Sequence, residues 1–255
     1  MHAGEIAARL DEELDTDAYA DIDASPNGLQ VGRAERSVGH VAVAVDAAVE
    51  TIERAAEAGA EMLLTHHGVV WGSIERVTEG NYRRIAPLVD SDLALYVAHL
   101  PLDGHQELGN AAGLAGLLDL DNRAPFGRMG GEYVGQRGRI VGGMALADIV
   151  STLDAELDTG EGTIRTLDFG PDTVEEVAIV TGSGVDWLGE AEDVGADLLI
   201  TGEGKQQAYH EAREAGINVV LAGHYATETF GVQALRPLLE AWDLETTFVD
   251  CPTGL

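Results

Sequence analysis

Short apolar runs that alternate with helix-like segments constrain the fold of this chain most. Residues 41–45, 61–65 and 93–98 are apolar for most of their length, as strands buried inside a sheet are. Between them, residues 49–56 place apolar side chains at helical spacing, and residues 86–89 belong to a second such segment. This order of strand, helix and strand predicts a mostly parallel sheet whose faces are covered by helices.

A glycine-rich segment interrupts this rhythm in the middle of the chain. Pro125 and seven glycines lie within residues 124–143, which predicts turns and a change of architecture, with a strand opening at 132–135. Later patterns predict helices over 146–157 and 230–242, and strands at 163–169, 177–181, 198–201, 219–222 and 246–249. We therefore expect a two-lobed α/β subunit with mostly parallel or mixed sheets, one lobe spanning 1–123 plus 220–255 and the other spanning 124–219.

The charge of the chain is strongly negative. Asp and Glu number 45 against 15 Lys and Arg, a formal charge of −30, and Lys205 is the only lysine. The acidic residues are spread between apolar segments, which argues against disorder. Repulsion of this size favours a high-salt cytoplasm, where salt screens it; an ordinary acidic protein is the alternative, but it does not explain the scarcity of lysine. The charge also makes duplex nucleic acid a poor partner.

The remaining bulk features indicate a cytoplasmic chain, and a small-molecule substrate is a possible partner. No apolar run approaches the roughly 18–20 residues that a membrane span needs, so no membrane association is expected. The first residues show neither a basic segment nor a long apolar stretch, so no secretory signal is visible. The single cysteine, Cys251, cannot form a disulfide within the chain.

Candidate metal ligands follow three of the apolar runs. His66 and His67 end one run, Asp103 comes shortly after another, and His224 and Glu228 follow a third at a spacing of four residues. Residues four apart share one face of a helix, and the carboxyl ends of parallel strands meet at one edge of a sheet. The alternative is one core and one solvated histidine, with Asp103 solvated or capping a helix.

The types of these five residues favour two cations over one. Carboxylates can bridge metals that lie ~3.5–4 Å apart, and three imidazoles complete the set. Nitrogen and oxygen ligands without thiolate suit zinc, iron, manganese or nickel. We therefore expect two divalent metal ions per subunit.

Other polar residues have two readings each. His99 and His105 follow the apolar run at residues 93–98. Each either orients a metal ligand or a substrate, or is a plain surface histidine. Glu203 and His210 lie seven apart, which puts them on one helix face as site residues or as a salt-bridged helix start. The amides of Ser183 and Gly184 follow a strand and either hold a phosphate or carboxylate of a substrate or form a tight turn.

Taken in order, several segments resemble the Nif-three-like dinuclear-metal family, also described as GTP cyclohydrolase I type 2 homologues. They are Asn27-Gly28-Leu29-Gln30-Val31-Gly32, Leu63-Leu64-Thr65-His66-His67-Gly68 with Trp71, His99-Leu100-Pro101-Leu102-Asp103, Gly109-Asn110, Thr181-Gly182-Ser183-Gly184, Thr201-Gly202-Glu203 and Ala222-Gly223-His224-Tyr225-Ala226-Thr227-Glu228. The resemblance implies a homohexameric ring with dinuclear sites that face its interior. It also implies the metal ligands His66, His67, Asp103, His224 and Glu228, the set that the residues themselves indicate.

Two functions are compatible with these observations. The first is a metal-dependent hydrolase that acts on a nucleotide or related heterocycle, the class that the family description suggests, with Glu203, His99 or His210 moving protons. The alternative is a non-catalytic metal-binding ring with a structural, storage or regulatory role. Metal removal separates them, because a structural metal holds the fold together and a catalytic one supports turnover.

Overall fold

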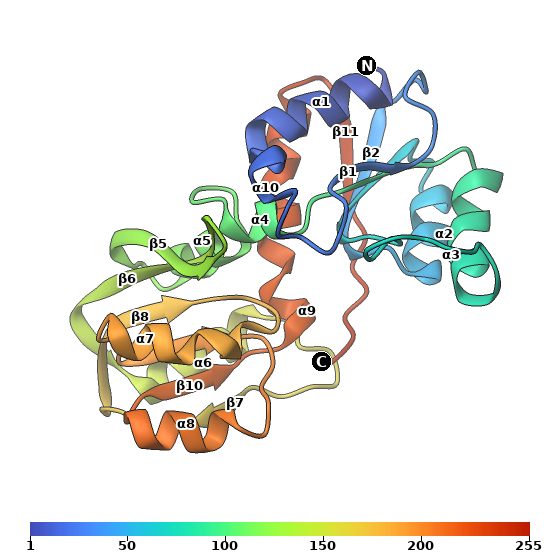
Figure 1. The fold of residues 1–255 in the computed structure, drawn as a ribbon. Coiled ribbons are helices and arrows are strands. Elements are labelled where there is room, and N and C mark those ends of the chain that lie inside the picture. The colour runs from blue at the N-terminus through green and yellow to red at the C-terminus, as the bar shows by residue number, and fades with distance from the viewer. The chain divides into compact units, whose positions relative to one another are not determined.

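The computed structural model describes residues 1–255, which form two compact units (Figure 1). Unit 1 comprises Met1–Leu102 and Gly231–Cys251, and unit 2 comprises Asp103–Phe230 and Pro252–Leu255. The chain passes from unit 1 into unit 2 at Asp103, whereas the sequence patterns place the start of the second lobe at residue 124. The reason is helix α5 (Asn110–Leu117), whose Ala111 and Leu114 belong to the apolar core of unit 2.

Unit 1 is built on a five-stranded sheet in the order β1-β4-β3-β2-β11. The strands are β1 (Gly28–Val31), β2 (His40–Asp46), β3 (Met62–His67), β4 (Ala94–Val97) and β11 (Glu245–Phe248). β11, β2, β3 and β4 are parallel, and β1 pairs with β4 in the antiparallel sense at the edge. The parallel part matches the βαβ prediction and brings the carboxyl ends of β2, β3 and β4 to one edge.

Helices cover the sheet of unit 1 because its central strands are apolar on both faces. Ala42 and Ala44 of β2 pack with Ile52 of α2 (Val49–Glu57) and with Leu88 of α3 (Glu79–Asp90). Figure 1 shows α2 and α3 together on one side of the sheet. The opposite side carries α1 (Ala3–Leu14) and α10 (Thr229–Glu240), whose buried leucines, valine and isoleucine lie at helical spacing. A short 3-10 helix, η1 (Thr16–Tyr19), follows α1.

Unit 2 contains a six-stranded mixed sheet in the order β5-β6-β8-β9-β10-β7. Its strands are β5 (Asp121–Met129), β6 (Glu132–Ala145), β7 (Arg165–Leu167), β8 (Thr173–Ile179), β9 (Leu198–Thr201) and β10 (Asn218–Leu221). β8, β9 and β10 are parallel, whereas β5, β6 and β7 pair in the antiparallel sense. The carboxyl ends of the parallel strands carry the motifs that begin at Thr181, Thr201 and Ala222.

The glycine-rich segment forms the β5–β6 hairpin, where glycines mark close packing as well as turns. A Cβ on Gly135 in β6 would overlap the carbonyl oxygen of Ile179 in β8. Gly130, with φ +61, forms the turn between the two strands. Pro125 lies in β5, which is an edge strand and therefore tolerates a missing backbone N–H. The predicted turns and the predicted strand that opens at 132 are both present, but the close packing at Gly135 was not predicted.

The helices of unit 2 and of its boundary are mostly short. They are α4 (Leu100–Gly104), which begins in unit 1, α5, α6 (Leu146–Glu156), η2 (Gly184–Trp187), α7 (Leu188–Asp193), α8 (Ala208–Ala215) and α9 (His224–Thr227). Leu114 of α5 and Leu153 of α6 pack with Val177 of β8 in one core. No helix combines the length and the apolar character needed to cross a bilayer.

Candidate metal centre

Three histidines of unit 1 lie at the carboxyl ends of two neighbouring parallel strands. His66 and His67 are the last residues of β3, and His99 follows β4. Ring centroids are 4.6 Å apart for His66 and His67, 5.0 Å for His66 and His99, and 5.7 Å for His67 and His99. One nitrogen from each ring lies within 4.8 Å of the others. The structure thus brings the predicted histidine pair together with His99.

Each of these rings is oriented by an oxygen that accepts from its Nδ1 atom. His66 Nδ1 lies 2.9 Å from the carbonyl oxygen of Ala98. His67 Nδ1 lies 2.8 Å from Asp46 Oδ1, and His99 Nδ1 lies 2.7 Å from Asp23 Oδ1. A carbonyl or carboxylate oxygen accepts a hydrogen, so Nδ1 is the donor in all three rings. A neutral ring of this kind carries its metal-binding lone pair on Nε2.

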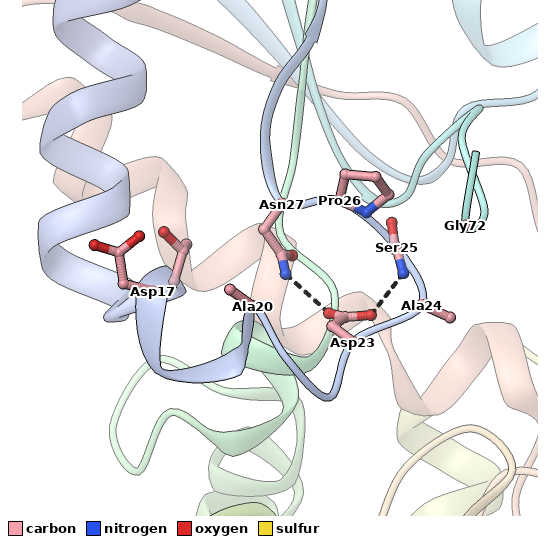
Figure 2. Close-up of a pocket in the computed structure, with 9 residues that line it drawn as sticks. Asp17, Ala20, Asp23, Ala24, Ser25, Pro26, Asn27 and Gly72 are labelled. Carbon is pink, nitrogen blue, oxygen red and sulfur yellow. Dashed lines mark hydrogen bonds between the residues drawn. The ribbon is translucent and has the colours of Figure 1, made fainter. Parts of the chain in front are cut away.

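Asp23 is held in a small loop between η1 and β1 (Figure 2). Its side chain is 1% exposed, and its Oδ1 accepts from the Ser25 amide at 2.8 Å as well as from His99. Oδ2 accepts from Asn27 Nδ2 at 2.9 Å and from the Leu100 amide at 3.0 Å. Burial alone would raise the pKa of Asp23, but the hydrogen bond and charge of His99 and the donors of Asn27 and Ser25 outweigh it and lower that pKa. Asp23 is therefore an ionised partner of His99.

Sequence reasoning missed both carboxylates that hold the histidines. Asp46 ends β2 and pairs in register with His67, so the strand-end pattern used for His66 and His67 contained the signal for it. Asp23 had no such signal, because it lies in an irregular loop and its partner His99 is 76 residues away. The nearest indication was Asn27, whose Oδ1 accepts from the His99 amide at 2.7 Å.

A pocket of about 400 Å³ opens beside this loop (Figure 2). It is lined by Thr16, Asp17, Ala20, Asp23, Ala24, Ser25, Pro26, Asn27 and Gly72. Gly72 donates its amide to the Ala24 carbonyl at 2.6 Å, which ties the segment after β3 to the Asp23 loop. The neighbouring Trp71 is 46% exposed, and its ring centroid lies 5.1 Å from that of His99 and 5.9 Å from that of His67.

In unit 2, Asp103 and the pair of His224 and Glu228 are each held by neighbouring polar groups. Asp103 Oδ1 accepts from Asn110 Nδ2 at 2.9 Å and from Thr181 Oγ1 at 3.1 Å. His224 Nε2 lies 3.3 Å from Glu228 Oε1, so the two side chains approach one another as their four-residue spacing predicts. His224 Nδ1 lies 3.2 Å from Glu203 Oε1 on its other side.

Glycine makes room for the His224–Glu228 pair. Gly182, which follows Thr181, has φ +57, and a Cβ built on it would overlap Glu228 Oε1 and lie 3.0 Å from His224 Nε2. A side chain there would be strained by its backbone and would displace both groups. The turn that contains Gly182 therefore shapes the space around these two side chains.

Two carboxylates control the protonation of His224. Burial alone would lower the pKa of His224, but the hydrogen bonds and charges of Glu228 and Glu203 outweigh it and raise the pKa to about 9. The pKa of Glu203 is lowered, first by the hydroxyl of Ser183, against burial, and then by His224. In the metal-free protein, His224 is therefore protonated and positively charged at neutral pH.

Comparison with known proteins places this chain in a family. The model of the family Duf34/NIF3 (NGG1p interacting factor 3) matches residues 1–253. The chain belongs to this family. It is 52% identical to the GTP cyclohydrolase 1 type 2 homolog of Halobacterium salinarum and 40% identical to that of Archaeoglobus fulgidus, with 100% of each chain covered.

Several solved structures have the same fold as this chain. Protein ybgI, described as of unknown function, aligns over 100% of both chains with a TM-score of 0.90 and 34% identity. TTHA1606 from Thermus thermophilus aligns over 100% of both with a TM-score of 0.88 and 38% identity. Reduced HcgD from Methanocaldococcus jannaschii aligns over 98% of both with a TM-score of 0.84 and 25% identity.

The remaining residues that the sequence suggested for the site are engaged in local contacts or lie apart from one another. Glu203 precedes α8 and His210 lies within it, so a seven-residue helical spacing does not relate them. His210 is exposed, and its ring contacts that of Tyr209 at 5.4 Å. His105 Nδ1 accepts the Leu108 amide at 2.9 Å, which is a local turn contact. The amide of Gly184 donates to Thr201 Oγ1 at 2.9 Å, so it is used inside the unit.

Proposed function

We propose that the protein is a metal-dependent hydrolase that acts on a nucleotide or a related heterocycle through two divalent cations. The ligands are His66, His67, Asp103, His224 and Glu228. The observation that carries the proposal is that four of these side chains are held by groups outside the ligand set: Nδ1 acceptors for His66 and His67, Asn110 and Thr181 for Asp103, and Glu203 for His224. The fifth, Glu228, lies 3.3 Å from His224. Such partners orient metal ligands and set their basicity. The family and the printed names of its members support the substrate class.

The residues of this chain would divide the work of hydrolysis. When bound, the cations would lower the pKa of a water molecule and stabilise a developing oxyanion. His99, fixed through Nδ1 by Asp23, presents Nε2 for proton transfer. Glu203, with its lowered pKa, stays ionised at neutral pH and accepts a proton as a base. His210 is the remaining predicted proton carrier, and Ser183 the remaining predicted substrate contact.

A substrate panel tests this proposal. Protein purified without chelator is assayed for hydrolysis of GTP, other nucleotides and free heterocycles, and metal content is measured by elemental analysis. We expect about two equivalents of metal and turnover that a chelator abolishes without unfolding the protein. Glu228→Gln should lower metal content, and Glu203→Gln should lower turnover with the metals retained. Glu211→Gln, an exposed change on α8, is the matched control. Unfolding by chelator would instead support the non-catalytic ring.

We also propose that the chain assembles as a homohexamer. Besides the family resemblance, the support is a group of exposed apolar side chains in one segment of unit 1: Trp71, Val77, Tyr82 and Val89. A soluble chain of net charge −30 gains little from exposing them, so another subunit is a fitting cover. Light scattering in high salt should give six times the subunit mass of 26.9 kDa. A monomer would refute the ring.

A further inference from the structure

We propose that Trp71 is a stacking platform on which the heterocycle of an uncharged nucleoside, or of a related free base, is recognised. This inference rests on the proposed function, because it names a residue that would select the substrate of that reaction. Trp71 belongs neither to the proposed metal ligands nor to the proposed proton carriers. All the residues that carry the argument lie in unit 1.

The first argument is the position of the indole. Its ring centroid lies 5.1 Å from that of His99, with the two planes at 82°, and 5.9 Å from that of His67, with the planes at 44°. Despite these contacts, 46% of the surface of Trp71 is exposed. A ring stacked on the indole at the usual centroid distance of roughly 4.5–7 Å would lie next to the residues proposed to bind a cation and to move a proton.

The second argument is that the segment around Trp71 is fixed on both sides by hydrogen bonds. Before it, the amides of residues 69 and 70 donate to Gln30 Oε1 at 3.1 and 3.2 Å. After it, the amide of Gly72 donates to the carbonyl oxygen of Ala24 at 2.6 Å. An exposed indole on a fixed segment loses little conformational freedom when a ligand stacks on it, and this preorganisation favours binding.

The side chain of Gln30 is itself held in place for this contact. Its Nε2 atom donates to the carbonyl oxygen of Pro26 at 2.7 Å, which leaves Oε1 directed at the segment before Trp71. Gly68 provides the space for this amide, because a Cβ built on Gly68 would overlap it. The end of β3 is therefore shaped to hold the backbone next to the indole.

Trp71 also differs from the other exposed apolar side chains of its segment. Val77 precedes α3, and Tyr82 and Val89 lie on α3 seven residues apart, so the last two share one face of that helix. That helix face can make the proposed subunit contact without Trp71. The indole is instead in contact with histidines of the candidate centre, where an aromatic ligand would use its exposed face.

The pocket beside this segment indicates which groups the ligand carries. Gly72, the neighbour of Trp71, lines the pocket together with the Asp23 loop (Figure 2). The lining includes the carboxylates of Asp17 and Asp23 and contains no lysine or arginine. Two carboxylates disfavour a phosphate there and favour hydroxyl or amino groups that donate hydrogen bonds. A nucleoside combines such donors with a planar heterocycle.

The test is the binding of guanosine to wild-type protein, Trp71→Leu and Trp71→Phe, measured by calorimetry on proteins of equal metal content. Ribose is the probe that carries the hydroxyl groups without the heterocycle. We expect Trp71→Leu to weaken guanosine binding about 5- to 150-fold, the range for the loss of one base–aromatic stack. Trp71→Phe keeps a smaller ring and should weaken it less. Ribose should bind equally weakly to all three proteins.

A matched control and a second readout keep the test decisive. Tyr209→Leu removes an aromatic side chain of similar exposure, 43%, from α8 and should leave guanosine binding unchanged. The platform is refuted if wild-type protein binds no guanosine, or if Trp71→Leu binds it as tightly as the wild type. Should Trp71→Leu fail to fold, NMR of guanosine with wild-type protein decides. Stacking on an indole shifts the H8 proton upfield on binding, and an unshifted H8 refutes the platform.

None of these measurements requires turnover, so the two proposals can fail separately. Wild-type protein that binds guanosine through Trp71 but hydrolyses no substrate would defeat the proposed function and support the platform. Metal-dependent hydrolysis of a heterocycle with the same KM in Trp71→Leu as in the wild type would support the proposed function and defeat the platform.

Discussion

A metal ion bound by His224, as proposed, would have to compete with a proton, because the pKa of His224 is raised. The ordinary pKa of histidine is near 6.5, and Glu228 and Glu203 raise that of His224 to about 9. A metal binds the neutral ring, so the proton must leave first. The perturbation is therefore pH, applied to metal-free protein during titration with zinc.

The magnitude follows from the two pKa values. With a pKa of about 9, the proton weakens the apparent metal affinity about 100-fold at pH 7. An unperturbed histidine would weaken it only about 1.3-fold at that pH. We therefore expect the affinity to rise about tenfold from pH 7 to 8, about fivefold from pH 8 to 9, and to level off above pH 9, with about one proton released from His224 at pH 7.5.

Calorimetry in buffers of different ionisation enthalpy counts the released protons. Glu203→Gln is the informative comparison, because it keeps the proposed ligands and removes one carboxylate that raises the pKa of His224. Protons lost from metal-bound water are common to both proteins, so the difference between them reports His224. Equal proton release and equal pH slopes in the two proteins would refute the argument. Glu211→Gln controls for the loss of one exposed charge.

Three further predictions concern stability. Gly182→Ala should lower metal content and should destabilise the protein by about 1–3 kcal/mol in urea unfolding. The reason is that the new Cβ would sit on a backbone with φ +57 and would overlap Glu228. The control, Gly189→Ala, should do neither, because no atom lies within 4 Å of its Cβ. Gly135→Ala should cost about 1–3 kcal/mol or prevent folding through its overlap with the Ile179 carbonyl, whereas Gly131→Ala, also without close neighbours, should be tolerated. Melting temperature should rise with KCl as the Debye length falls from about 30 Å at 0.01 M to about 3 Å at 1 M, and a flat response would remove the halophile interpretation.

The sequence predicted the parts of the structure that depend on local pattern. The runs that became β2, β3, β9 and β10 are apolar without interruption over most of their length, and the ends of β3 and β10 carried ligand candidates. The approach of His224 and Glu228 also followed from a four-residue spacing alone.

The rest depended on contacts between distant segments. Asp23 meets His99 across 76 residues, and neither flanking sequence shows that they are partners. Gly135 resembles a turn glycine in sequence, and only its neighbour Ile179 shows that it permits close strand packing. Glu203 was placed on a helix because its spacing to His210 fitted one, but the helix starts at Ala208.

Trp71 gives the protein an optical signal of its own. Its indole lies beside His67 and His99, whereas Trp187 bonds to the Arg128 carbonyl and Trp242 lies under the Arg9 guanidinium. A paramagnetic ion held by the histidines would therefore quench the fluorescence of Trp71 at short range. Occupancy of the histidine cluster can thus be followed in real time by fluorescence, without a label and at any salt concentration that the protein requires.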